Sequence, residues 1–255
     1  MSLPTPYYED GKLTIYHADA RVILPQLPNE SIDMIFTDPP FGHNNNDGDL
    51  IHNWEKALGR PATLASESRP IANDGFDDSN DLVKWFFRES KRLLQEGSCC
   101  CCCGGGGPDP QFARWSLWMD DVLSFKQMVV WDKGPMGMGW HYRRSYETVL
   151  VAQRDEGKCR WYDETDKVEN IIRRIPKIIP SKDDHPTPKP PALVAYFLRL
   201  HSLPGHLVLD PFMGGGSTAW ACKELGRRFL GCELDERWCE LTVKRLAQEV
   251  FDFHV

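Results

Sequence analysis

Two short segments of this 255-residue chain carry side chains that could do chemistry together. Residues 38–41 read Asp-Pro-Pro-Phe, and residues 210–218 read Asp-Pro-Phe-Met-Gly-Gly-Gly-Ser-Thr. The first segment offers hydrogen-bond acceptors and an aromatic face, and the second is an acid that runs into a glycine loop. Together they predict a site that holds a cofactor beside a planar amine.

The glycine segment has the order of a strand, an acid, a loop and a helix. Such a unit presents free backbone N–H groups and a helix N-terminus, and its glycines let a ligand approach the backbone. The spacing Gly214-x-Gly216-x-x-Ala219 matches the dinucleotide fingerprint. Glu233 lies 19 positions beyond Gly214, where a carboxylate can bind ribose hydroxyls.

Two details of the same segment argue against NAD. Asp210 would repel a pyrophosphate but suits a cationic amino-acid cofactor, and only about 20 residues follow Glu233, too few for a second nucleotide-binding half. S-adenosylmethionine has a ribose, an adenine and an ammonium but no phosphate, and it fits better. An NAD-dependent oxidoreductase remains an alternative that thermal protection by each cofactor would distinguish.

The Asp-Pro-Pro-Phe segment could act on an exocyclic amine. Pro39 and Pro40 fix φ and remove N–H donors, which leaves the carbonyl before them free to accept, and Asp38 adds a carboxylate. Two acceptors that converge on an NH2 group would turn its lone pair toward an electrophile. Phe41 offers a stacking face for a planar base, although a proline turn with a core Phe is the structural alternative.

These motifs, taken in their order along the chain, resemble those of the β-class amino DNA methyltransferases. That family methylates N6 of adenine or N4 of cytosine, and it places the catalytic motif first, then a variable region, then His-Pro-Thr-x-Lys-Pro, then the glycine motif. Here the third motif is residues 185–190, His-Pro-Thr-Pro-Lys-Pro. The resemblance covers nearly the whole chain, except for residues 42–80 and 155–184.

The resemblance implies an α/β fold with a Rossmann-like, seven-stranded mixed sheet in circularly permuted motif order, of the S-adenosylmethionine-dependent type. It implies that Asp38, Pro39, Pro40 and Phe41 are catalytic and that Asp19 lies near the cofactor adenine. Thr187 and Lys189 would lie by the methionine end, although Thr187 could instead cap the following helix. The implied cofactor contacts, with those of the loop added, are Asp19, Thr187, Lys189, Asp210, Phe212, Gly214, Gly216, Ser217, Thr218 and Glu233.

The resemblance also implies that the substrate is double-stranded DNA whose target base flips into the pocket. Adenine N6 is favoured because the motif begins with Asp38, and a Ser there is more typical of the alternative, cytosine N4. A non-catalytic DNA-binding decoy and a methyltransferase acting on RNA or protein are further alternatives. We also expect a cytoplasmic protein that a bacterium or a phage encodes, with a cognate restriction enzyme as a candidate partner.

Hydrophobic periodicity predicts the elements that must position these motifs. Seven strands are expected at 13–19, 32–38, 99–103, 125–131, 146–152, 207–210 and 229–233. Helices are expected at 81–96, with Ser79 as cap and Gly97 as stop, and at 112–122, 190–201, 217–225 and 235–250. Strands that alternate with helices predict a largely parallel sheet covered on both faces.

Five consecutive cysteines, Cys99–Cys103, precede four glycines. Adjacent strand residues point to opposite faces, so five in a row cannot converge on one tetrahedral ion. The run therefore predicts a buried central strand, and no metal site is predicted.

Composition predicts one domain over 1–255, with 41% hydrophobic residues, no apolar run long enough for a membrane span and no secretion signal. The net charge is −7, yet residues 126–182 hold 12 Lys and Arg against 8 Asp and Glu. We expect 134–184 to be the target-recognition segment that contacts DNA, with 173–177 and 141–144 as its basic residues. We expect the insertion 42–80 to fold over the flipped base or to bind a second subunit in a homodimer.

Overall fold

The computed structural model describes residues 3–42, 71–72, 74–105, 111–134, 143, 145–165, 167–181 and 184–248. Most of the predicted insertion 42–80 lies outside these residues, as do His141, Tyr142 and Arg144 of the predicted recognition segment. Within the described residues, no helix is long and apolar enough to cross a membrane.

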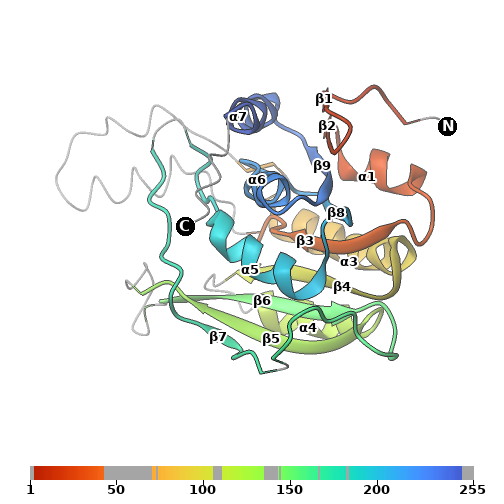
Figure 1. Cartoon of the computed structure of the whole chain (residues 1–255), viewed down its shortest axis with the longest axis vertical. Coiled ribbons are helices and arrows are strands. Elements are labelled where there is room, and N and C mark those ends of the chain that lie inside the picture. The colour runs from red at the N-terminus through yellow and green to blue at the C-terminus, as the bar shows by residue number, and fades with distance from the viewer. Residues whose placement is uncertain are drawn as a thin grey trace.

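The described residues form one mixed sheet of nine strands in the order β1-β2-β9-β8-β3-β4-β6-β5-β7 (Figure 1). The strands are β1 (Tyr8–Glu9), β2 (Leu13–His17), β3 (Ile32–Thr37), β4 (Leu94–Gly105), β5 (Ser124–Asp132), β6 (Tyr146–Gln153), β7 (Ile171–Ile172), β8 (Leu207–Asp210) and β9 (Arg228–Glu233). The seven predicted strands are all present. The two-residue strands β1 and β7 were not predicted, because each is too short to show a period.

The central strands β2, β9, β8, β3 and β4 are parallel, so their carboxyl ends share one edge of the sheet. The strand β6 is antiparallel to both of its neighbours, β4 and β5. The predicted mixed sheet is therefore confirmed, with two short strands more than the seven expected.

Helices cover both faces of the sheet. On one face lie α1 (Ala20–Ile23), the 3-10 turn η1 (Leu24–Gln26), α3 (Phe76–Leu93) and α4 (Gln111–Asp120), which share a core cluster with Ile35, Cys100 and Cys102. On the other lie α5 (Pro191–His201), α6 (Ser217–Glu224) and α7 (Glu236–Leu246), which pack with Phe36, Cys101 and Cys103. Figure 1 shows α5 and α6 on the opposite side of the sheet from α3 and α4.

The cysteine run lies in the central strand β4, as predicted. All five side chains are buried, and alternate members join the two opposite core clusters. Burial of the run between two helical layers explains its small apolar composition.

The predicted limits of the helix at 81–96 are wrong. The helix α3 begins five residues earlier, after Gly75, and Ser79 is buried within it and does not cap it. Its hydroxyl instead donates a hydrogen bond to the carbonyl of Pro40. At the other end the chain passes directly from Leu93 into β4, and Gly97 lies inside that strand with φ 75°.

Candidate active site

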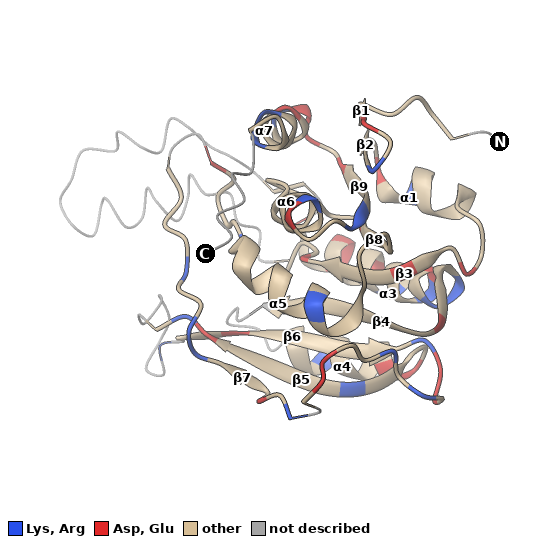
Figure 2. Ribbon diagram, viewed as in Figure 1, with Lys and Arg blue, Asp and Glu red and all other residues tan. Residues whose placement is uncertain are grey.

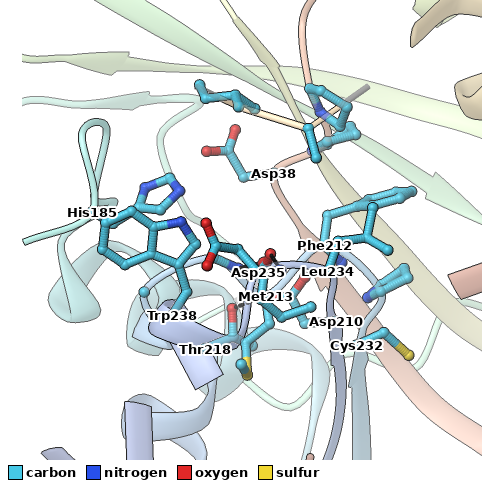
Figure 3. A pocket seen from close by; sticks show the side chains of 18 of the residues that line it. Asp38, His185, Asp210, Phe212, Met213, Thr218, Cys232, Leu234, Asp235 and Trp238 are labelled. Carbon is cyan, nitrogen blue, oxygen red and sulfur yellow. Dashed lines mark hydrogen bonds between the residues drawn. The ribbon is translucent and has the colours of Figure 1, made fainter. Parts of the chain in front are cut away.

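A cleft opens at the carboxyl ends of β2, β3, β8 and β9 (Figure 3). Its empty volume, which includes open solvent at the mouth, is about 1230 Å³. The lining includes most of the predicted site residues: Asp19, Asp38, Pro39, Pro40, Phe41, Thr187, Lys189, Asp210, Phe212, Gly214, Ser217, Thr218 and Glu233. Gly216 is the one predicted residue outside it.

The Asp-Pro-Pro-Phe segment follows β3 and is held by hydrogen bonds from the first helical layer. Ser79 binds the carbonyl of Pro40, and Gln111 Nε2 donates to the carbonyl of Phe41 at 2.9 Å. The amide of Gly42 donates to Asp74 Oδ1 at 2.8 Å. Because prolines cannot pair as strand residues do, these side chains fix the path of the segment after the strand ends.

Asp38 is joined to the His-Pro-Thr-Pro-Lys-Pro motif by an ion pair. Lys189 Nζ lies 2.5 Å from Asp38 Oδ2 and 3.3 Å from Glu147 Oε2 on β6. The second oxygen of Asp38, Oδ1, is buried and has no hydrogen-bond partner among the described residues. A buried acceptor without a partner is costly, so this oxygen is available to a donor that enters the cleft.

The protonation of this group follows from its burial and its charges. Burial would lower the pKa of the Lys189 ammonium, but Asp38 and Glu147 outweigh that effect and raise it. Burial raises the pKa of Asp38, and Lys189 opposes the rise. The pKa of Glu147 falls to about 2, since Lys189 and Lys133 overcome the opposite effect of burial.

Glu147 and Lys133 were missed by sequence reasoning. Lys133 Nζ lies 2.9 Å from Glu147 Oε1, so Glu147 bridges two ammonium groups. The one local signal is an acid within the apolar strand 146–152, where a buried charge needs a partner. The partners themselves come from other elements, so the sequence could not name them.

The glycine motif is organised around the Asp210 carboxylate. Thr37 Oγ1 donates to Asp210 Oδ1 at 2.7 Å, and Thr218 Oγ1 donates to Oδ2 at 2.6 Å. The amide of Phe212 also reaches Oδ1, at 3.2 Å. Burial raises the pKa of this carboxyl to about 6 even though the three hydrogen bonds lower it. Asp210 thus ties β8, β3 and the start of α6 together at the floor of the cleft.

Two other predicted residues also brace the loop. Ser217 Oγ donates to the carbonyl of Lys189 at 2.6 Å, which joins the two motifs. Gly216 has φ 78°, and a Cβ there would lie 2.4 Å from the side chain of Thr242 on α7. Glycine at 216 therefore permits close packing of α7, and its contact is with protein, not with the cleft.

The acids after β2 and β9 lie on the rim of the cleft. Glu233 accepts from the amides of Gly214 and Asp235, each at 2.8 Å, and burial raises its pKa against those bonds. Asp19 caps α1 by accepting from the amide of Arg21. Both side chains are anchored by backbone and still line the cleft.

One wall of the cleft is aromatic and was not predicted. Trp238 at the start of α7 lies edge-on to His185, with ring centroids 5.0 Å apart, and both line the cleft (Figure 3). A Cβ at Gly214 would lie 3.2 Å from His185 Nε2, so the absence of a side chain at Gly214 leaves room for the imidazole ring. Thr187 also faces the cleft, and α5 begins after Pro190 with no side-chain cap, so the capping alternative for Thr187 is wrong.

The residues present suit a cofactor with a cationic end and a ribose. Asp19, Glu233 and Asp235 place carboxylates at the cleft, and the one lysine among its described lining residues, Lys189, is held between two acids. A pyrophosphate would meet these acids without a cation to offset them, whereas an ammonium, a sulfonium and ribose hydroxyls would be favoured. This composition fits S-adenosylmethionine.

The chain belongs to the N6/N4 DNA methylase family, whose model matches residues 32–244. It is 24% identical over 270 residues to the type II methyltransferase M2.DpnII of Streptococcus pneumoniae, covering 96% of this chain and 93% of the relative. It is also 24% identical over 277 residues to the DNA adenine methyltransferase YhdJ of Escherichia coli K12, covering 95% and 85%.

Solved structures share the fold. The cytosine-N4-specific PvuII DNA methyltransferase matches with a TM-score of 0.71 at 17% identity, covering 97% of this chain and 90% of that one. The Thermus thermophilus protein TTHA0409, a putative DNA modification methylase in complex with S-adenosyl-L-methionine, matches with a TM-score of 0.66 at 23% identity, covering 94% and 95%. The protein is thus a DNA amino-methyltransferase with S-adenosylmethionine as its methyl donor.

Proposed function

We propose that this enzyme methylates the N6 amine of adenine at a specific site in double-stranded DNA. The observation that carries the proposal is the buried Oδ1 of Asp38, which has no hydrogen-bond partner among the described residues and belongs to a residue of the cleft that Phe41 also lines. One relative is named a DNA adenine methyltransferase, which supports adenine as the target base. The Asp that opens the motif also favours adenine. Cytosine N4 is the second candidate, supported by the similarity to the cytosine-N4 enzyme fold.

In this mechanism the target nucleotide flips out of the duplex and its base stacks on Phe41. Asp38 Oδ1 accepts an N–H of the exocyclic amine, which turns the nitrogen lone pair toward the cofactor. Bound S-adenosylmethionine would supply an electrophilic methyl group. Asp38 then takes the proton that the methylated amine loses, and its raised pKa makes it a better base for that step. Lys189 holds the carboxylate in place through its other oxygen.

The proposed cofactor contacts are the residues that line the cleft around the glycine loop. Glu233 would bind the ribose hydroxyls and Asp19 would lie by the adenine. Thr187 and the loop residues Phe212 and Gly214 would surround the methionine portion. Because Asp210 and Ser217 already make internal hydrogen bonds, we expect them to shape the loop and to contact the cofactor only with their remaining acceptor capacity.

The proposed DNA surface lies along the segment between β7 and α5. Figure 2 shows basic residues on that segment, and the exposed ones among its described residues are Arg173, Arg174 and Lys177. Arg173 is exposed and pairs with Glu169 at 2.7 Å. An exposed pair of this kind is weak, so the guanidinium can exchange Glu169 for a phosphate.

The test is to identify the methylated nucleoside. DNA incubated with the protein and S-adenosylmethionine is digested and analysed by mass spectrometry, and sequencing that reads modified bases locates the motif. N6-methyladenine at a defined site supports the proposal. N4-methylcytosine would overturn the adenine assignment and support the second candidate, methylation of cytosine N4. Modification of RNA or protein in place of DNA would overturn both.

A further inference from the structure

Three metal-ligating side chains meet at the end of the sheet opposite the cleft. They are Cys99 on β4, Cys159 on the segment after β6, and His201 at the last position of α5. One ligand atom from each residue lies within 4.8 Å of the other two, and the sulfurs of Cys99 and Cys159 are 3.2 Å apart. We propose that Cys99, Cys159 and His201 form a structural site for a soft divalent metal ion of the Zn²⁺ class.

The ligand side chains Cys99 and His201 are buried, so their polar atoms need a hydrogen-bond partner or a bound ion. Cys99 is 1% exposed and His201 is 5% exposed. The Nδ1 atom of His201 is buried and has no hydrogen-bond partner among the described residues. An orphaned imidazole nitrogen is costly in a protein core, and coordination to a metal removes that cost.

The chemistry of the three ligands matches the ion. Two thiolates and one neutral imidazole give a −2 set, so a divalent cation makes the buried group neutral. On binding, two metal–sulfur bonds and one metal–nitrogen bond form, and the thiol protons pass to solvent.

The geometry is nearer to a metal site than to a disulfide. Zinc–sulfur bonds of about 2.3 Å in a tetrahedron place the sulfurs about 3.8 Å apart, so the observed pair must widen by roughly half an ångström. A disulfide needs about 2.04 Å, an approach of more than an ångström. Cys159 is half-buried and lies outside the helices and strands, so it can make the smaller shift and admit a water as fourth ligand.

Hydrogen bonds already bring the three segments together. The amide of Arg160 donates to the carbonyl of Gly97 at 2.9 Å, and the amide of Tyr162 donates to the carbonyl of Leu200 at 2.9 Å. A Cβ at Gly97 would lie 2.8 Å from the carbonyl oxygen of Lys158, so the glycine lets the segment approach β4 closely. The ion would fasten the far end of α5, whose first residue follows Lys189 and Pro190.

The sequence does not predict this site, because the five adjacent cysteines form a strand and their spacing fits no metal site. Only one of them contributes here, and its partners are 60 and 102 positions away. The site depends on the tertiary arrangement of three elements.

The experiment measures metal content in protein purified in reducing buffer without chelators and with its affinity tag removed. Elemental mass spectrometry should find one equivalent of Zn²⁺ per chain in the wild type. Cys159→Ser and His201→Gln should lose it. Cys100→Ser is the matched control, because Cys100 is the next residue on β4, faces the opposite core and would place its hydroxyl near that of Ser90.

A second readout uses the wild type alone, so it does not depend on whether a variant folds. Co²⁺ added to chelator-treated protein should give sulfur-to-cobalt charge-transfer absorption, and Zn²⁺ should abolish it and protect Cys159 from alkylation. Failure to bind either ion, or equal metal content in wild type, Cys159→Ser and His201→Gln, would overturn the proposal. A Cys99–Cys159 disulfide in place of metal would also overturn it and indicate a redox pair.

Discussion

The ammonium of Lys189 lies 2.5 Å from a carboxylate oxygen of Asp38, a contact between two sequence motifs that are 151 residues apart. It occupies one oxygen of Asp38, and the other, Oδ1, has no hydrogen-bond partner among the described residues. The position of the Asp38 carboxylate, which we propose as the acceptor for the substrate amine, is therefore set by the motif that precedes the glycine loop.

Replacement of Asp38 should separate chemistry from cofactor binding. Asp38→Ala removes the acceptor for the amine, so we expect methyl transfer to fall by about 10²-fold or more while cofactor affinity stays nearly unchanged. Single-turnover transfer of labelled methyl groups and calorimetric binding measure the two effects. Asp121→Ala, an exposed acid beyond α4, is the control. A normal rate in Asp38→Ala would remove this segment from the active site.

Glu147→Gln tests the second carboxylate beside Lys189. It removes one carboxylate partner from the buried ammonium of Lys189 and from the partly buried ammonium of Lys133. Because Asp38 still faces Lys189, we expect a loss of about 1–3 kcal/mol in the free energy of unfolding at pH 7. The folded pKa of Glu147 is about 2, below its ordinary value of 4.5, so its contribution is present above pH 4.5 and is lost as pH falls toward 2. The difference between wild type and variant in denaturant unfolding should shrink across that window; a constant difference would contradict the assignment.

Asp210 should show the opposite dependence on pH. Its folded pKa of about 6 lies above its ordinary 3.8, so the folded state binds the proton more tightly and the carboxyl's contribution declines as pH rises from about 4 to about 6. Asp210→Asn should remove this decline and keep hydrogen bonds to Thr37 and Thr218. The check is the unfolding free energy of both proteins at several pH values. Parallel curves would show that Asp210 does not titrate in this range.

Cofactor selectivity can be measured by thermal shift. A ligand that binds only the folded state adds about 2.7 kcal/mol at a hundredfold excess over its Kd. S-adenosylhomocysteine should therefore raise the Tm and NAD should not. Glu233→Gln should weaken the effect of S-adenosylhomocysteine, because the ribose hydroxyls would lose a charged acceptor. Protection by NAD alone would contradict the identification of the cofactor.

The double variant Arg173→Ala/Arg174→Ala tests the DNA surface. It should weaken DNA binding and flatten its dependence on salt, while cofactor affinity stays the same. Lys244→Ala is the matched control, since Lys244 also forms an exposed i,i+4 pair, with Glu240 at 2.7 Å, but on α7. Equal salt slopes in the double variant and the wild type would place the recognition surface elsewhere, with 42–80 as the next candidate.

The parts of the site that could be predicted from sequence are the short motifs of adjacent residues. Asp38–Phe41 and Asp210–Thr218 each follow a strand, so their place at the carboxyl edge of a parallel sheet follows from local pattern and topology. Thr37 binds Asp210, Glu147 binds Lys189 and Trp238 lines the cleft only through the pairing and packing of distant elements. No spacing along the chain indicates such contacts.

The difference between local sequence pattern and contacts from distant elements also explains the wrong prediction of the start of α3. A serine before an amphipathic run is a common cap, and Ser79 fits that pattern. In the folded protein its hydroxyl serves Pro40 instead, and the helix starts at Phe76 after Gly75, without a side-chain cap. A tertiary hydrogen bond therefore took precedence over local propensity.

The hydrogen bond from Gly42 to Asp74 has a consequence for how this enzyme could diversify. It joins the two residues that flank the stretch from 43 to 73. A Cβ added at Gly42 would lie 3.1 Å from the Cα of Phe76, so the glycine allows this close approach to α3. Because Gly42 and Asp74 already close the two ends, we expect a change in the number of residues between them to cost little loop-closure free energy. Ile71 and Ala72 line the cleft, so variation in length would have to fall before them.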